Sequence, residues 1–383
     1  MILPAYVFAD GVELAPDSIA ACASSIRAGG LIGLPTETVY GLGADADNAN
    51  AVAQIFAAKG RPADHPLIVH VASFDGGMSG VAHYAQQVPS FAQQLMSAFW
   101  PGPLTLIVKR RDGVGTAAAG GQNSIGLRCP LHPVAQALLT ALRKPEGADA
   151  VVWGIAAPSA NRFGRVSPTT AAHVQSEFAE LELRSGQSLP ILDGGPCTLG
   201  IESTIVDCTR GVPVLLRPGS ITRAEIEVAC GRKVLSNEEL LTQEQQGLQG
   251  ENAVNVAPKA SGTLESHYAP NATVRLMDAK ALQAALDVLD LADKDLPGGD
   301  SPSRSIETQA RPSIAVYART HLTSASAQVM QRKMPTDATV AAHELFSLLR
   351  EFDDAGVKLI WVETPPPELA WDGVRDRLQR ASA

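Results

Sequence analysis

Short apolar runs alternate with helix-like stretches along most of this 383-residue chain, and that alternation limits the possible folds more than any other feature. Most runs end in turns that carry glycine, proline, serine or a charged side chain. Alternation of this kind predicts an α/β fold, with strands in a sheet and helices packed against it. The expected strands of the first part are 31–34, 66–71, 104–109, 124–127, 152–157, 189–192, 203–207 and 212–216. The expected helices are 15–28, capped near Asp17, 48–59, two pieces of 81–98 separated at Pro89, 133–143 and 169–181.

The texture of the sequence changes around residues 222–265, where a short helix is expected before a stretch rich in Gln, Glu and Asn. This stretch predicts a linker and possible lid over 226–265. Alternation then resumes, so we expect a first domain over 1–225 and a small C-terminal α/β domain with an open parallel sheet over 266–383. Its expected strands are 273–278, 313–318 and 358–363, and its expected helices are 279–291, 337–354 and 371–381. A mobile insertion is expected at 292–312.

Composition indicates the compartment. No basic segment leads into an apolar one at the start, and no uncharged apolar run is long enough to span a membrane. The cysteines are widely spaced without a CxxC pair, so we expect reduced structural thiols in a cytoplasmic protein and no zinc site. They are Cys22, Cys129, Cys197, Cys208 and Cys230.

The charge of the chain is acidic overall but uneven. A net charge of −9 argues against a protein that coats nucleic acid, because such binding requires a basic face. Several cations nevertheless lie in or beside small-residue turns of the first 220 residues, which favours a compact site for a small anion. They are Lys59, Arg61, Arg128, Arg162, Arg165 and Arg217.

Polar and basic side chains gather at the ends of the expected strands, where open α/β sheets bind ligands. Each group taken alone has a structural explanation: a helix C-terminal charge at Lys59 and Arg61, a plain turn at 159–161, a strand edge at 202–204. Their conjunction is what indicates a site. The five groups are 35–43, 59–70, 124–128, 158–169 and 193–219.

Six motifs occur in an order that resembles the YrdC-like threonylcarbamoyl-AMP synthase family. They are PTETVYGLG, KGRP…PLIVHV, WPGPLT, AAPSANxxGxxSPT, DGG…GIESTIVD and LRPG. The segment HYAP at 267–270 and the closing DRLQRAS resemble the long, two-domain form of that family. The likeness is dense over 15–225 and looser beyond. It implies a YrdC-like twisted mixed sheet with helices, followed by a smaller Rossmann-like domain.

The resemblance also implies an activity. Members of the family are nucleotidyltransferases that combine L-threonine, bicarbonate or CO2, and ATP into threonylcarbamoyl-AMP and diphosphate. A separate tRNA threonylcarbamoyl transferase then modifies an adenosine of tRNA, so we expect binding of tRNA itself to be weak at most. ATP chemistry implies Mg²⁺. No Asp/Glu cluster has the spacing of a protein-built metal site, and Glu37 and Asp193 are candidates for indirect roles only.

The residues themselves fit that chemistry. Transfer to the α-phosphorus requires positioning and positive charge more than a protein nucleophile. Lys59 and Arg61, the predicted catalytic residues, supply that charge together with Arg217, since guanidinium groups match phosphate oxygens. By motif position, the resemblance places the ATP contacts on Arg61, His65, Ser124, Ser159, Ser167 and Arg217.

The resemblance places the threonine contacts on Thr38, His70, Arg128, Ala157 and Ser203. Arg128 is the natural partner of the substrate carboxylate, because a guanidinium binds a carboxylate through two parallel hydrogen bonds. Ala157 would act through its backbone carbonyl. The PTETVYGLG turn is then one wall of a threonine pocket.

Two positions depart from the family pattern. His65 stands where the family often has Asn, and a histidine there either contacts the nucleotide or is an exposed turn residue. Glu265 stands where the family often carries a tyrosine, two residues before His267, so a lid contact at that position is lost. Tyr268 would then serve only in packing.

Two other functions are compatible with the fold class. One is a different carbamoyl-transfer enzyme, as in hydrogenase maturation, although those proteins carry zinc-finger segments and this chain has no CxxC pair. The other is a non-catalytic RNA-binding module. The acidic charge and the lack of a basic stripe interleaved with aromatic residues argue against it.

Overall fold

The computed structural model describes residues 1–4, 6–8, 12–143, 150–181, 188–247, 257–264, 266–294 and 312–383. The chain divides into two compact units. The first comprises Met1–Phe163 and Ser167–Leu264, and the second comprises Gly164–Val166 and Glu265–Ala383. The sequence did not predict that the short segment Gly164–Val166 groups with the C-terminal part of the chain.

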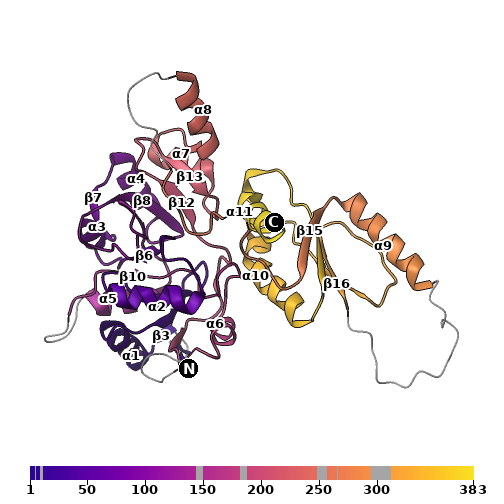
Figure 1. The fold of residues 1–383 in the computed structure, drawn as a ribbon, viewed down its shortest axis with the longest axis horizontal. Helices are drawn as coiled ribbons and strands as arrows, with labels where there is room; N and C mark the ends of the chain where they lie inside the picture. Colours follow the sequence, from indigo (N-terminus) through magenta and orange to yellow (C-terminus); the bar gives the residue numbers. More distant parts are fainter. Residues whose placement is uncertain are drawn as a thin grey trace. The chain divides into compact units, whose positions relative to one another are not determined.

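A twelve-stranded mixed sheet forms the centre of the first unit and confirms the predicted twisted mixed sheet (Figure 1). Its order is β1-β11-β4-β5-β10-β6-β9-β8-β12-β13-β14, with β7 paired to β8. The strands are β1 (Ile2–Pro4), β4 (Ile32–Leu34), β5 (Gly41–Asp45), β6 (Ile68–His70), β7 (Ala85–Gln87), β8 (Leu104–Arg110), β9 (Ser124–Arg128), β10 (Ile155–Ala156), β11 (Ile191–Asp193), β12 (Thr204–Asp207), β13 (Val214–Arg217) and β14 (Leu235–Ser236). A separate hairpin joins β2 (Tyr6–Phe8) and β3 (Val12–Leu14).

Two buried apolar clusters pack against this sheet. One contains residues of α1 and α5 together with Ile155, and the other contains residues of α2, α4 and α7 together with Ala156. Consecutive strand residues point to opposite faces, so the helices form a layer on each face of the sheet. The helices are α1 (Pro16–Arg27), α2 (Ala49–Lys59), α3 (Met78–Tyr84), α4 (Ser90–Phe99), α5 (Pro133–Arg143), α6 (Ala171–Glu177), α7 (Arg223–Cys230) and α8 (Asn237–Gly247).

The helix ends differ from expectation in two places. The predicted cap at Asp17 is wrong: α1 begins at Pro16, whose missing N–H costs nothing in the first turn, and Ala15 provides no side-chain cap. The interruption within 81–98 is larger than a proline kink, because the short strand β7 separates α3 from α4. At the start of α2, by contrast, the Asn48 side chain accepts hydrogen bonds from two N–H groups, as expected for a helix cap.

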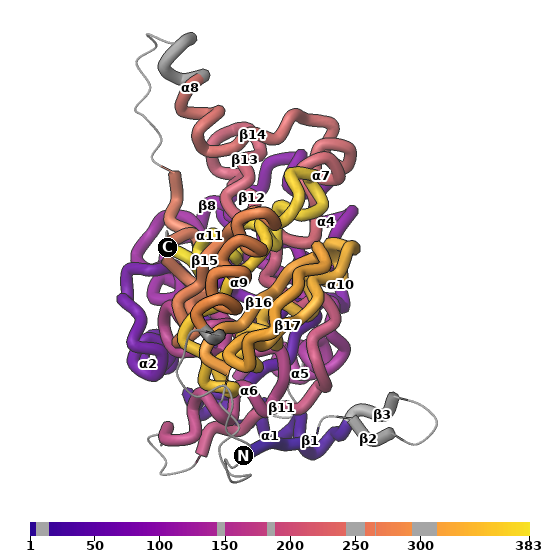
Figure 2. The backbone as a smooth tube through the Cα atoms, turned by 90° about the vertical axis from the view of Figure 1, so that its right-hand side faces the viewer, coloured from indigo at the N-terminus to yellow at the C-terminus, as the bar shows by residue number. Residues whose placement is uncertain are grey.

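The expected short helix near residue 222 is confirmed as α7, and the stretch after it contains more regular structure than the linker prediction allowed. Thr222 and Glu225 form a capping box that begins α7. Ile226, Cys230 and Val234 then join the core of the first unit, and β14 extends its sheet. Figure 2 shows β13, β14 and α8 side by side at this end of the unit. After α8, the described segment 257–264 of the predicted linker contains no helix or strand.

The second unit is a parallel four-stranded sheet in the order β15-β18-β16-β17, as expected. The strands are β15 (Thr273–Met277), β16 (Ile314–Ala318), β17 (Val329–Lys333) and β18 (Leu359–Glu363). Helix α9 (Ala279–Lys294) covers one face, and α10 (Ala338–Asp354) and α11 (Asp372–Ala381) cover the other, with a short 3₁₀ turn η1 (Leu369–Trp371) before α11 (Figure 1). The sequence missed β17 because its residues are partly or fully exposed and form no apolar run. Glu265 and most of the expected insertion, 295–311, lie outside the described residues.

Two predictions about the environment can be compared with the structure. All five cysteines are buried and free, as expected for structural thiols. Over the described residues, no helix combines the length and the apolar character that crossing a membrane requires.

Candidate functional site

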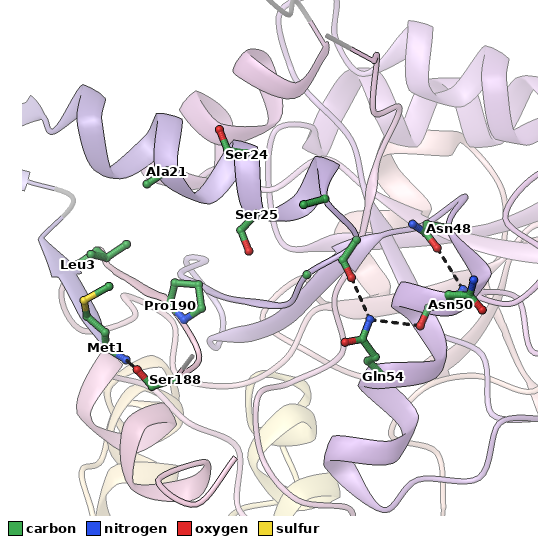
Figure 3. A pocket seen from close by; sticks show the side chains of 13 residues that line it. Met1, Leu3, Ala21, Ser24, Ser25, Asn48, Asn50, Gln54, Ser188 and Pro190 are labelled. Carbon is green, nitrogen blue, oxygen red and sulfur yellow. Dashed lines mark hydrogen bonds between the residues drawn. The ribbon is translucent and has the colours of Figure 1, made fainter. Parts of the chain in front are cut away.

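A cavity of about 850 Å³ lies beside the amino-terminal ends of β4 and β11 (Figure 3). Uncharged side chains and backbone line it, and none of the predicted site residues is among them. Thr38 instead lies in the turn after β4, and His70 and Arg128 end β6 and β9, which pair in parallel. We therefore locate the candidate site around these residues. The lining residues of the cavity are Met1, Leu3, Ala21, Ser24, Ser25, Ala28, Gly29, Gly30, Asn48, Asn50, Gln54, Ser188 and Pro190.

The turn after β4 forms a buried network of hydroxyl groups. Thr36 Oγ1 donates to Val39 O at 2.6 Å, and Thr36 Oγ1 and Thr38 Oγ1 lie 2.9 Å apart. Both side chains are almost completely inaccessible to solvent. The turn is therefore not continuing a strand, and it holds the Thr38 hydroxyl in place for a partner across the sheet.

That partner is Arg128, the last residue of β9. Its Nη1 donates to Thr38 Oγ1 at 2.8 Å, its Nη2 donates to Glu37 Oε1 at 2.6 Å, and its Nε donates to Gly102 O at 3.2 Å. The second carboxylate oxygen of Glu37 accepts from Leu131 N at 3.1 Å. The arginine and the glutamate form a buried ion pair. The structure thus brings the predicted carboxylate clamp together with the opening turn.

His70 lies next to Arg128, because β6 and β9 pair in parallel with these two residues in register. The imidazole is buried, and its Nδ1 has no hydrogen-bond partner among the described residues. Burial, and then the charge of Arg128, lowers the pKa of His70 to about 3. The ring is therefore neutral near pH 7 and can accept or donate one hydrogen bond at Nδ1, depending on its tautomer.

Ala157 follows β10 and lies beside the start of β6, where its N–H donates to Ile68 O at 3.0 Å. A Cβ on Gly41 would lie 3.0 Å from the Ala157 Cβ, which explains why the turn of the opening motif carries glycine at that position. The backbone of Ala157 consequently lies close to both the turn and β6.

Ser203 connects two predicted contact sets. Its Oγ lies 2.8 Å from Thr105 Oγ1, and Arg217 Nη2 donates to the same Oγ at 3.2 Å. Arg217 also donates to Ser203 O through Nε and Nη2. Thr105 pairs with Arg128 in the β8–β9 ladder, so this row of side chains runs from the predicted threonine pocket to the predicted nucleotide side. Sequence reasoning missed Thr105, although it closes the WPGPLT motif.

Lys59 ends α2 and is buried. Its Nζ donates to Ser159 O at 2.5 Å and also to Asn161 O, so the ammonium holds the backbone of the SAN turn. Burial, followed by the repulsion of Arg61, lowers the pKa of Lys59 well below its ordinary value. Lys59 and Ser159, predicted separately, are therefore in direct contact.

Arg61 and His65 share an aromatic neighbour that sequence reasoning missed. The Arg61 Cζ lies 5.9 Å from the centroid of the Phe163 ring, and the His65 ring lies 5.6 Å from it in a T-shaped arrangement. Arg61 Nη2 donates to Pro66 O at 3.0 Å. Partial burial, then Arg61, lowers the pKa of His65. His65 is half-buried against Phe163, not a fully exposed turn histidine.

Ser167 and Ser124 occupy different surroundings. Ser167 Oγ donates to Glu202 Oε1 at 2.5 Å, and both side chains are buried; Glu202 directly precedes Ser203 in the chain. Ser124 begins β9 and lines a small cavity with Gly126, under a roof formed by 259–261. Glu202 is a buried acid in the candidate site that the sequence offered only as part of a strand edge.

The segment 259–261 is tied to the first unit at three points. Lys259 Nζ lies 2.6 Å from Asp64 Oδ2, and Gln122 exchanges hydrogen bonds with the Lys259 backbone. Arg217 Nη1 donates to Ser261 O at 2.9 Å. A predicted phosphate-binding arginine thus contacts the linker directly.

Other predicted groups do not join the site. Arg165 binds Asn271 Oδ1 and pairs with Asp353 within the second unit, so the expected six-residue basic group is wrong at this member. Arg162 is exposed. Asp193 Oδ1 accepts from Gly195 N in a local turn. Within the described part of the chain, no group of three or more His, Cys, Asp or Glu residues could hold a metal ion.

Comparisons with known proteins agree along the whole chain. The Sua5/YciO/YrdC family model, described as "Telomere recombination", matches residues 24–219. The model for the threonylcarbamoyl-AMP synthase C-terminal domain matches residues 221–383.

Individual relatives extend this likeness. A threonylcarbamoyl-AMP synthase of Bacillus subtilis is 34% identical over 95% of this chain and 92% of its own length. One of Pyrococcus abyssi is 41% identical over 67% of this chain and 66% of its own length. The crystal structure of P. abyssi Sua5 complexed with L-threonine aligns with a TM-score of 0.76 and 32% identity over 100% of this chain and 97% of that one. The chain therefore belongs to the Sua5/YciO/YrdC family, in its two-domain form with a threonylcarbamoyl-AMP synthase C-terminal domain.

Proposed function

We propose that the chain is a threonylcarbamoyl-AMP synthase, which converts L-threonine, bicarbonate or CO2, and ATP into threonylcarbamoyl-AMP and diphosphate. The observation that carries the proposal is the buried cluster around Arg128, with its guanidinium fixed by Glu37 and Thr38 beside the neutral His70. A related structure holds L-threonine, and two curated relatives bear the synthase name. The alternative functions, another carbamoyl-transfer enzyme or an RNA-binding module, gain nothing from these comparisons.

The pocket suits an amino acid. Arg128 would bind the carboxylate through two parallel hydrogen bonds. Thr38, His70, Ser203 and the Ala157 carbonyl would then surround the amine and the hydroxyl. A cation and a neutral imidazole next to the amine disfavour its protonated form, which assists attack of the amine nitrogen on the carbon of CO2. The N–C bond forms as one C–O π bond opens, and the nitrogen gives up a proton to water to leave a carbamate.

The second step joins the carbamate to the nucleotide. A carbamate oxygen attacks the α-phosphorus, a new P–O bond forms, and the bond from that phosphorus to the bridging oxygen breaks, releasing diphosphate. Lys59, Arg61 and Arg217 would offset the negative charge on the phosphates in a poorly solvated site. Ser124, Ser159, Ser167 and His65 are the remaining nucleotide contacts that we propose.

Mg²⁺ fits this site as a companion of ATP. Mg²⁺ is commonly held by one or two carboxylates together with substrate phosphates. The oxygen ligands that the chain offers there are the Glu202 carboxylate and the Ser167 hydroxyl, which lie together and buried. When bound, the ion would neutralise part of the phosphate charge.

Residues 257–264 would act as a lid. They pack on the first unit through Lys259 and Ser261, and they roof the small cavity beside Ser124. A roof of that kind excludes water and protects a mixed anhydride from hydrolysis. The product would pass to a tRNA threonylcarbamoyl transferase in the cytoplasm. The net charge of −9 favours weak binding of tRNA by this chain itself.

The test is release of diphosphate from ATP, measured with threonine and bicarbonate together and with each omitted. The proposed function requires release that depends on both, and mass spectrometry should detect threonylcarbamoyl-AMP. Release independent of threonine would overturn the proposal, and so would binding of RNA without any turnover.

A further inference from the structure

The hydroxyl groups of the opening turn lie in one continuous chain of hydrogen bonds. Arg128 Nη1 contacts Thr38 Oγ1 at 2.8 Å, Thr38 Oγ1 contacts Thr36 Oγ1 at 2.9 Å, and Thr36 Oγ1 contacts Val39 O at 2.6 Å. All three residues are at least 97% inaccessible to solvent. Water therefore does not reorganise the chain, and its direction can be worked out from its two ends.

Both ends have a fixed polarity. A guanidinium only donates, so Thr38 Oγ1 accepts from Arg128, and a backbone carbonyl only accepts, so Thr36 donates its single hydroxyl proton to Val39 O. Thr36 must then accept at its contact with Thr38, and Thr38 must donate there. Two backbone N–H groups, of Thr38 and Val39, also point at Thr36 Oγ1 from 3.2 Å, which agrees with its role as acceptor.

Thr38 consequently has no proton left for a ligand. Its hydroxyl has one proton and two lone pairs, of which Thr36 takes the proton and Arg128 takes one lone pair. Toward a bound molecule, Thr38 Oγ1 can act only as an acceptor. An isolated threonine hydroxyl would rotate and serve as either.

Arg128 can act toward a ligand only as a donor, and its orientation is fixed as well. Three of the five N–H groups of its guanidinium donate to Gly102 O, Thr38 Oγ1 and Glu37 Oε1, which leaves two without a partner in the described chain. Glu37 is itself held by Leu131 N at its other oxygen. The plane of the guanidinium is therefore set from three sides, and the two remaining donors have a fixed direction.

We propose that Thr36 and Glu37 are positioning residues that fix the polarity of the amino-acid pocket, with Arg128 as donor to the carboxylate and Thr38 as acceptor from the ammonium or hydroxyl. The inference deepens the proposed function, on which it rests, by naming residues that act through these two contacts. The pocket then selects ligands with a carboxylate at one end and a hydrogen-bond donor at the other.

The first test replaces Thr36 by Val, which keeps the branched shape and removes the hydroxyl. Thr38 is then free to turn its proton toward the ligand. We expect the KM for threonine to rise about tenfold, as for one lost hydrogen bond to a charged group, with kcat and the KM for ATP within about twofold. Thr36→Ser, which keeps the hydroxyl, should restore the KM.

The second test replaces Glu37 by Gln. Gln can accept from Arg128 through its oxygen but then presents an amide N–H₂ to the Leu131 N–H, so the guanidinium loses its fixed plane. We expect a KM for threonine raised at least about tenfold, again without a matching change for ATP. A parallel readout is the rise in Tm that threonine alone produces, which does not depend on turnover.

The outcomes separate this inference from the proposed function. If the wild-type protein gains stability from threonine but releases no diphosphate, the proposed function fails and the Tm shifts of the variants still decide the role of Thr36 and Glu37. Equal effects on threonine and ATP in both variants, or no rescue by Thr36→Ser, would overturn the positioning role. If Thr36→Val does not fold, Thr36→Ala, which also lacks the hydroxyl, has the same expected result.

Discussion

The two halves of the candidate site are built differently. On the amino-acid side, Thr38, Glu37 and Arg128 bind one another through side chains, and the pocket has its donors and acceptors in place. On the nucleotide side, Lys59 donates to two backbone carbonyls and Arg61 donates to another. In the first half the side chains bind one another, whereas the cations of the second half donate to backbone carbonyl groups.

The difference implies that ATP must displace contacts that threonine need not displace. Phosphate oxygens carry full charge and are stronger acceptors than carbonyl groups, so exchange of Arg217 from Ser261 O to a phosphate is favourable. That exchange would also release one attachment of the linker. We therefore expect threonine to bind the protein with little rearrangement and ATP to bind it with movement of segment 257–264.

The largest expected effect concerns the amino-acid side of the candidate site. If Thr38, His70 and Ser203 pair the threonine hydroxyl, 2-aminobutyrate should be used about 10⁴-fold less well in kcat/KM, because the polar groups of the pocket are then left unpaired. Steady-state assays with both amino acids provide the measurement. Equal turnover would show that this half does not recognise the hydroxyl.

The buried ion pair should give the next largest effect, on stability. Replacing Arg128 by Ala leaves the Glu37 carboxylate buried without its partner and should cost about 3–5 kcal/mol in the free energy of unfolding. Urea denaturation measures this change. The double variant Arg128→Ala/Glu37→Ala should lose less than the sum of the two single variants, and strict additivity would contradict a coupled pair.

On the nucleotide side, Arg61→Ala should weaken the use of ATP by about 2–5 kcal/mol in kcat/KM, since a charged contact to phosphate is lost. The KM for threonine should stay within a few-fold. A circular dichroism spectrum like that of the wild-type protein serves as the control for folding. Diphosphate release at the wild-type rate would remove Arg61 from the proposed catalytic residues.

His70 gives a smaller, pH-dependent effect. Its pKa is lowered from 6.5 to about 3 in the folded protein, so the unfolded chain takes up a proton below pH 6.5 that the folded protein does not bind. Stability should therefore fall as the pH decreases from 6.5 toward 3. Between pH 7.5 and pH 5, the wild-type protein should lose about 2 kcal/mol more than His70→Asn does. Urea unfolding at the two pH values checks this, and parallel losses would contradict a neutral buried imidazole.

The sequence predicted the site where strand ends decide it. Thr38 follows β4, Arg128 ends β9, Arg217 ends β13 and Ser203 directly precedes β12. Polar residues at these strand ends come together in the contacts of Thr38 with Arg128 and of Ser203 with Arg217. The fold class followed from the same alternation of apolar runs and helical stretches.

What the sequence did not predict depends on partners far away in the chain. Arg165 looked like one more cation in a small-residue turn, but its acid, Asp353, lies 188 residues on. Thr105 belongs to a strand interior, where one hydroxyl among apolar residues has no local signal of its contact with Ser203. The order of the large sheet likewise depends on strands distant in sequence, such as β1 beside β11.

Helix α8 was missed for a different reason. Its residues are strongly polar, so no apolar stripe distinguishes them from a linker, and its start is supported by a hydrogen bond from Ser236 N to the Glu239 side chain.

The structure also limits how the proposed lid can be tested. Truncation after residue 225 would remove Ile226, Cys230 and Val234 from the core, so it would damage the first unit as well as the lid.

The smallest expected effect concerns the lid and is best tested in the full chain. Lys259 and Asp64 are both well exposed, so Lys259→Ala should leave the Tm unchanged. It removes one of the three attachments of segment 259–261, and we expect hydrogen exchange over 257–264 to become faster while exchange in the sheet is unaffected. Exposed ion pairs are screened by salt, so raising the ionic strength should speed exchange over 257–264 in the wild-type protein and have little effect on the variant.

With threonine and ATP both present, hydrogen exchange over 257–264 should become slower in the wild-type protein, and the variant should release more hydrolysed adenylate as AMP. If the rate of exchange over 257–264 changes with neither the substitution nor the ligands, the segment is a passive tether, and it does not cover the nucleotide side of the site.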